Sequence, residues 1–64
     1  MRESPQLTLI AGGSCGRDDC PAVSTSDRGT VAVQGYDLAR ETPAGESVVE
    51  VPVAVLREAV RALG

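Results

Sequence analysis

Apolar and polar residues alternate along much of this 64-residue chain, and the period becomes helical near the C-terminus. Residues 7–10 form a short β-prone run that ends before two glycines. Residues 23–36 alternate on either side of the Ser-Asp-Arg-Gly sequence at 26–29, which predicts a β-hairpin closed by Gly29. Residues 48–51 alternate in the same way and predict a further strand.

Two segments rich in glycine, proline and charged residues predict loops. The first, residues 12–21, contains both cysteines, and the second, residues 37–47, contains a Pro-Ala-Gly turn. Between the hairpin and the second loop, Gly35 indicates a bulge or a close approach of two backbones. We expect Tyr36 to be the last residue of the hairpin's second strand.

The last segment has the period of an α-helix over residues 52–63. Pro52 suits a first helical turn, because the N–H that proline lacks would have no partner there. Gly64 suits the position that follows a helix. Apolar residues recur every three or four positions, and we expect this stripe to pack on the sheet: Val53, Leu56, Ala59 or Val60, and Leu63.

These elements predict one small α+β domain over residues 1–64, in which an antiparallel sheet of three or four strands carries one C-terminal helix. We expect residues 1–6 to be disordered, residues 7–51 to be β-rich with a cysteine loop at 12–21, and residues 52–63 to be helical. The predicted core consists of Leu7, Leu9, Val31, Val33, Val49, Val51, Leu56, Val60 and Leu63.

The composition makes this predicted core thin. Tyr36 is the only aromatic residue, and most of the apolar side chains are Val, Ala and Leu. Small domains without large aromatic side chains often need a disulfide, a metal or a partner for stability. We therefore expect a homo-oligomer or a complex with another protein.

The chemistry available to a single chain is limited. The sequence contains no His and no Lys, which excludes His-based acid–base catalysis and Schiff-base chemistry within one chain. The adjacent Asp18 and Asp19 are typical turn residues, and no third carboxylate is placed in register with them. We expect no catalytic residue, no enzyme activity and no bound cofactor.

Cys15 and Cys20 are the most conspicuous pair of residues in the sequence. Four residues separate them, a spacing that suits a disulfide or a structural thiol pair. They could also supply two of the four ligands of a zinc site, with the other two coming from a second chain in a dimer. A redox role is a third alternative, although redox-active cysteines are more often separated by two residues.

The net charge of −3 does not favour nucleic acid as a partner. Residues 37–50 carry most of the negative charge, and the candidate contacts for a partner or a nucleic acid are Arg28, Arg57 and Arg61. No apolar run is long enough to span a membrane, and the N-terminal residues do not match a secretory leader. We expect a cytoplasmic protein.

Residues 48–64, a strand followed by Pro52 and a helix, resemble the corresponding segment of AbrB-type swapped-hairpin regulators. That resemblance implies a dimer that binds DNA through arginine-bearing strands. The family continues with two further strands after the helix and carries basic residues that this chain lacks. The whole chain, with its Cys-Gly-Arg-Asp-Asp-Cys-Pro loop, is also similar to short uncharacterised actinobacterial proteins, which implies at most a regulatory setting.

From these observations we expect a small, non-enzymatic accessory or regulatory protein that acts by binding a protein partner or itself. One alternative is a DNA-binding swapped-hairpin regulator or antitoxin-like protein. Another is a zinc-binding module in which Cys15 and Cys20 are shared across a dimer.

Overall fold

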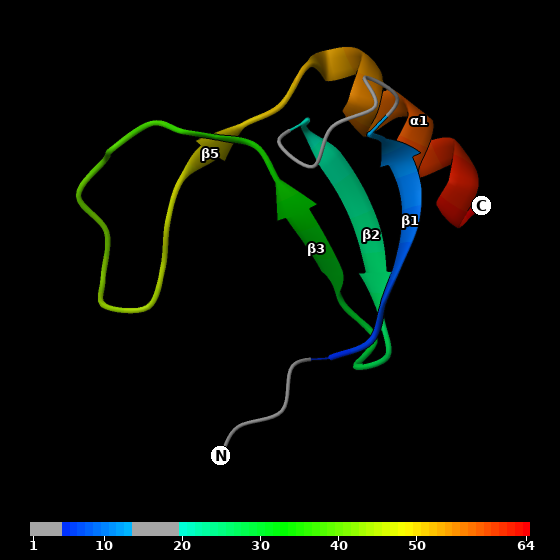
Figure 1. The fold of residues 1–64 in the computed structure, drawn as a ribbon, viewed down its shortest axis with the longest axis horizontal. Coiled ribbons are helices and arrows are strands. Elements are labelled where there is room, and N and C mark those ends of the chain that lie inside the picture. The colour runs from blue at the N-terminus through cyan, green and yellow to red at the C-terminus, as the bar shows by residue number, and fades with distance from the viewer. Residues whose placement is uncertain (1–4, 14–19) are drawn as a thin grey trace.

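The computed structural model describes residues 5–13 and 20–64, and this part of the chain folds into two small antiparallel sheets and a helix (Figure 1). The elements are β1 (Leu7–Gly12), β2 (Ala22–Ser26), β3 (Val31–Gln34), β4 (Tyr36–Asp37), β5 (Val49–Glu50) and α1 (Val53–Leu63). Strands β1, β2 and β3 form one sheet in that order, β4 pairs with β5, and α1 packs on β1 and β2. The predicted α+β class, with a C-terminal helix on an antiparallel sheet, is confirmed.

The predicted hairpin is present as β2 and β3, and Ser26 organises its turn. The Ser26 Oγ accepts hydrogen bonds from the backbone N–H groups of Arg28, at 3.1 Å, and Thr30, at 3.3 Å. Gly29 has a φ of +77°, a left-handed conformation that glycine adopts without steric cost. One serine therefore satisfies two backbone donors of the turn.

Tyr36 does not end the hairpin, as the alternation had predicted, but begins β4 of the second sheet. Gly35 separates the two sheets because the backbone of β5 passes directly beside it. A Cβ at Gly35 would clash with the carbonyl oxygen of Glu50 and would lie 2.8 Å from Cγ1 of Val51. The expected close approach at Gly35 is thus the point where the chain leaves the first sheet.

A β-bulge in β1 places Leu9 and Ala11, which are two residues apart, on opposite faces of the sheet. Leu9 is paired with Ser24, whereas Ala11 is paired with Val23, so Ile10 is the extra residue. Paired residues share a face and neighbouring residues on β2 face opposite ways. Leu9 therefore points away from the face on which Ala11 and Val23 lie.

The core lies on the face of the first sheet that carries Ala11 and Val23, where α1 packs on the strands through small side chains. Ala59 of the helix, 2% exposed, packs with the buried Ala11 and Val23, and Ile10 and Val55 lie against this cluster. At the edge of the contact, the Gly12 N–H donates a hydrogen bond of 3.3 Å to Oε1 of Glu58. Small residues allow the helix to approach the strands closely.

The predicted core was wrong in most of its members. Val49 and Val51 are half-buried. The other seven are exposed: Leu7, Leu9, Val31, Val33, Leu56, Val60 and Leu63. The bulge turns Leu7 and Leu9 away from the face that carries α1, and the helix contacts the sheet through Ala59 and Val55 instead of through its larger residues. The helix lies over β1 and β2, so it does not cover Val31 and Val33 of β3.

The helix ends as the sequence predicts and begins one residue later. Pro52 is the N-cap residue rather than the first helical residue, and no side chain caps this end. Gly64 follows the last turn with a φ of +100°, and its N–H donates to the carbonyl oxygen of Arg61 at 3.3 Å. Helix α1 therefore spans eleven residues.

The two remaining predictions concern the N-terminal segment and the cysteine loop. Residues 1–4 and 14–19 lie outside the described residues, so the predictions for them stay untested. Gln6 is held by a 3.1 Å hydrogen bond from the Asp27 N–H to its carbonyl oxygen. The Gly13 N–H donates to the carbonyl oxygen of Pro21 at 3.1 Å, which brings the two ends of the cysteine loop together.

Candidate functional site

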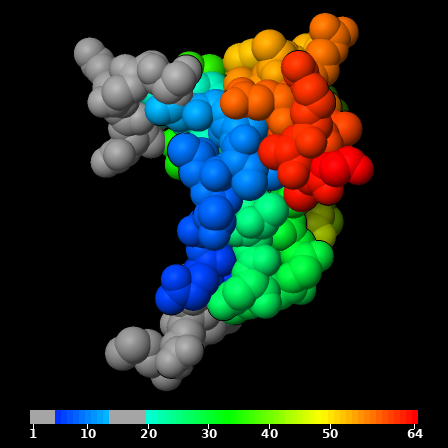
Figure 2. Space-filling view, turned by 90° about the vertical axis from the view of Figure 1, so that its right-hand side faces the viewer, coloured from blue at the N-terminus to red at the C-terminus, as the bar shows by residue number. Residues whose placement is uncertain are grey.

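The most unusual surface of the described residues is an apolar stripe along α1. We call Val53, Leu56, Val60 and Leu63 the helix stripe. Leu56 is 53% exposed and Val60 is 60% exposed, while Ala59 beside them is buried. In the space-filling view α1 (orange to red) forms the outer edge of the molecule beside β1 (blue) (Figure 2). The stripe thus lies along an exposed side of the helix, next to the buried Ala59.

Two arginines border the helix stripe. Arg57 and Arg61 lie one helical turn apart, and together with Val53, Leu56 and Val60 they line a shallow groove along α1. Both guanidinium-bearing residues are exposed. A partner at this groove would meet an apolar floor with positive charge along one edge.

The apolar surface continues from the helix onto β3. Val31 and Val33 are paired with Thr25 and with the buried Val23, so they lie on the face of the sheet that carries α1. The helix lies over β1 and β2 and leaves both valines exposed. Leu63 and Val31 line one shared depression, so the stripe and the strand are continuous. We call the stripe with Val31 and Val33 the helix–strand surface.

A second feature is a long excursion between the two short strands of the second sheet. Residues 36–50, which we call the acidic arm, project from the body of the molecule on the side away from α1 (Figure 1). Its charged residues are exposed, with four carboxylates and one guanidinium: Asp37, Arg40, Glu41, Glu46 and Glu50. Three large apolar side chains of the arm are also exposed, namely Tyr36, Leu38 and Val48.

Local hydrogen bonds give the acidic arm a defined course. Beyond β4 and β5, the Leu38 N–H donates to the Val48 carbonyl oxygen at 3.1 Å. Oδ1 of Asp37 accepts a 2.7 Å hydrogen bond from the N–H of Ala39, a residue with a φ of +55°. At the far end, the Thr42 hydroxyl donates to the Glu46 carbonyl oxygen at 2.6 Å.

The arginines singled out from the sequence fall into two groups. Arg57 and Arg61 share one face of α1, whereas Arg28 lies in the β2–β3 turn. None of the strands β1 to β5 carries an arginine. The contact of α1 with the sheet is made by Ala59, which the sequence interpretation named as an alternative to Val60, and by Val55 four residues earlier, which it did not name.

Cys20 is disulfide-bonded and buried, with 6% of its surface exposed. Its carbonyl oxygen accepts a 3.0 Å hydrogen bond from Nε2 of Gln34, which ties the end of the cysteine loop to β3. Cys15, the other cysteine of the sequence, lies outside the described residues, so the Cys15–Cys20 pairing stays a prediction. Zinc binds the thiolate form of cysteine, so the zinc hypothesis requires that this disulfide be reduced.

Within residues 5–13 and 20–64, no three His, Cys, Asp or Glu residues gather in a way that could hold a metal ion. In the same part of the chain, no helix is long and apolar enough to cross a membrane. Comparisons with protein-family models, with curated proteins and with solved structures find no match to this chain. The candidate site is therefore defined by its geometry and charge alone.

Proposed function

We propose that this protein is a small, non-enzymatic accessory or regulatory protein that acts by binding protein through the helix–strand surface. The supporting observation is an inversion of the usual burial pattern. On α1, Ala59 is buried against the sheet, whereas the four larger side chains of the helix stripe are exposed, and Val31 and Val33 of β3 are exposed as well. Contiguous exposed apolar surface of this kind is typical of protein–protein interaction sites.

The free energy available at the helix stripe is large for a chain of this size. Fully burying a Val or Leu side chain contributes about 1.5–3 kcal/mol, and each stripe residue is more than half exposed. Covering the four would therefore contribute on the order of 4–6 kcal/mol. The whole free energy of unfolding of a typical domain is about 5–15 kcal/mol, so this contribution is comparable with the lower part of that range.

The proposal is tested by placing a charge on the helix stripe and on an equally exposed leucine elsewhere. Leu56→Asp should abolish chemical cross-linking of the chain to protein, either to itself or to a partner in an extract of its own host. Leu9→Asp is the matched control, because Leu9 is 57% exposed and points to the opposite face of the sheet. Equal loss in both variants, or no cross-linking of the unmodified chain, would overturn the proposal.

The DNA-binding alternative has weaker support. AbrB-type regulators use arginines on strands, whereas Arg57 and Arg61 lie on α1 beside an apolar groove. An apolar floor suits a protein partner better than a phosphate backbone, whose recognition depends on an excess of positive charge. Absence of a DNA mobility shift at low salt is the expected result.

A cytoplasmic location remains part of the proposal and depends on the redox state of Cys20. Lasting disulfides are rare in a reducing cytosol and common in oxidising compartments. Alkylation of the protein in intact cells of its host should label Cys20 if the protein resides in the cytoplasm. Because Cys20 is buried, the labelling is repeated after denaturation, and protection that persists there would indicate an oxidising compartment instead.

A further inference from the structure

We propose that the helix–strand surface is covered by the acidic arm of a second copy of this chain, in a reciprocal dimer. This inference rests on the proposed function, because it names the partner of the same surface. The two surfaces have complementary properties, and both belong to one sequence. The helix groove combines apolar side chains with Arg57 and Arg61, and the arm combines apolar side chains with carboxylates.

Charge favours the arm over a second helix as the occupant. If α1 paired directly with α1 of another copy, Arg57 and Arg61 of both chains would come together around one apolar seam. Juxtaposed like charges oppose such an association. The acidic arm instead presents four carboxylates and one guanidinium, so it brings an excess of the opposite charge to the groove.

The apolar content of the arm matches the surface it would cover. Tyr36, Leu38 and Val48 are exposed, and Tyr36 is the only aromatic residue of the chain. Aromatic residues are enriched in the buried centres of interfaces. These three side chains can replace the water on the helix stripe with apolar contacts while the carboxylates meet the arginines at its edge.

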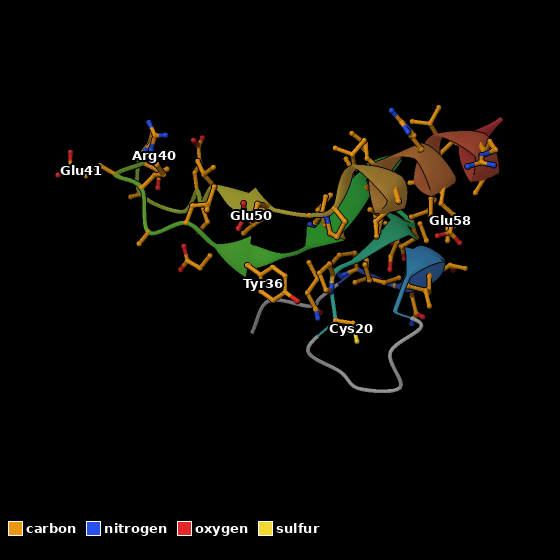
Figure 3. The ribbon with its side chains drawn as sticks, turned by 90° about the horizontal axis from the view of Figure 1, so that it is seen from above. Cys20, Tyr36, Arg40, Glu41, Glu50 and Glu58 are labelled. Atoms are coloured by element: carbon orange, nitrogen blue, oxygen red, sulfur yellow. The ribbon has the colours of Figure 1, made fainter. Side chains whose placement is uncertain are left out.

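The arrangement of the fold separates the arm from the helix of its own chain. In the view from above, Arg40 and Glu41 lie at one end of the molecule, and α1 with Glu58 lies toward the other (Figure 3). Figure 1 shows the same separation, with the arm on one side of the first sheet and α1 on the other. The arm therefore does not cover the helix of its own chain. In the proposed dimer a two-fold axis relates the two contacts, arm on helix and helix on arm, so that the assembly is closed.

The test reverses the charge of each surface separately in the full-length, oxidised chain. The helix-reversed variant carries Arg57→Glu and Arg61→Glu, and the arm-reversed variant carries Glu41→Lys and Glu46→Lys. Sedimentation equilibrium over a range of concentrations at low salt should show a dimer for the unmodified chain. Each variant should dissociate about tenfold or more readily. Asp27→Lys, a charge reversal in the β2–β3 turn, is the control and should leave the dimer unchanged.

Mixing the two variants is the decisive measurement. In a mixed dimer the acidic arm of the helix-reversed chain meets a basic helix, and the basic arm of the other chain meets an acidic helix. The mixture should therefore form a dimer with the affinity of the unmodified chain. Substitutions that merely destabilised each monomer would not restore association on mixing. Failure of the mixture to associate, despite folded variants by circular dichroism, would overturn the arm-on-helix contact.

The remaining outcomes separate this inference from the proposed function. A monomer at every concentration that still cross-links to another protein through Leu56 overturns the dimer and retains the interaction surface. A monomer that cross-links to nothing overturns both. The chain could also form a dimer that Leu56→Asp abolishes and that the arm-reversed variant still forms. That result would show association through the helix stripe alone, and would overturn the acidic arm as the partner of the stripe.

Discussion

Enlarging Ala59 should unfold this protein more effectively than any change to the larger residues of the same helix. Ala59 is 2% exposed and packs against Ala11 and Val23, which are themselves almost completely buried. A leucine at this position adds three carbon atoms where no free space remains, so α1 must move away from the sheet. Overpacking of this kind costs about 1–3 kcal/mol, which for a domain this small lowers Tm by about 5–20 °C.

The assay is thermal and urea unfolding followed by circular dichroism, with Ala54→Leu as the matched control. Ala54 is on the same helix but exposed, so the same substitution there changes only the helix propensity. It should alter the free energy of unfolding by about a few tenths of a kcal/mol. If Ala59→Leu unfolds at the same urea concentration as Ala54→Leu, α1 does not dock on the sheet through Ala59. The description of the core would then be wrong.

Three further perturbations test other parts of the fold. Gly35→Ala should destabilise the protein by about 1–3 kcal/mol in urea unfolding, because the added Cβ would clash with the Glu50 carbonyl. Gly45 has open space around it and a φ of +86°, so the control Gly45→Ala should cost only about 1 kcal/mol. A larger loss for Gly45→Ala than for Gly35→Ala would contradict the close approach at Gly35. Ser26→Ala should lower the unfolding free energy by about 1 kcal/mol, because it removes the hydroxyl that accepts hydrogen bonds in the β2–β3 turn. Ser26→Thr keeps a hydroxyl and should lower it less. Equal losses of stability in the two variants would count against these hydrogen bonds. If Cys15 is the partner of Cys20, the disulfide closes a loop of about six residues, and reducing it should lower the unfolding free energy by about 2 kcal/mol. An unchanged Tm in reductant would exclude a stabilising role.

Local sequence signals located the hairpin and the helix of this chain, although they did not separate β4 from β3. The alternation around residues 26–29 located the hairpin, and the change to a helical period after Pro52 located α1 to within one residue. Gly35 was also correctly identified as a close approach. Each of these features depends on residues that are near one another in sequence, where turn chemistry and periodicity are decisive.

The core could not be predicted in the same way, because it depends on which faces meet. Periodicity shows that α1 has a stripe of large apolar residues, but it does not show whether that stripe faces its own sheet or another molecule. The bulge at Ile10 has no clear signature in the sequence, and it reverses the side on which Leu7 and Leu9 lie. The candidate interaction surface was therefore mistaken for the interior, while the acidic arm was identified only as a negatively charged loop.

The bulge in β1 also divides the strand into two regions that can vary independently. Ala11, after the bulge, is fixed by its contact with Ala59, whereas Leu7 and Leu9, before it, face the opposite side and contribute little to that contact. Deletion of Ile10 would leave Ala11 paired with Val23, but it would remove a side chain that packs against the core, so Ile10 and Ala11 are under stronger constraint than the first residues of β1. Among relatives of this protein, we expect substitutions to accumulate freely at the start of β1 and to be limited to small or apolar residues at positions 10 and 11.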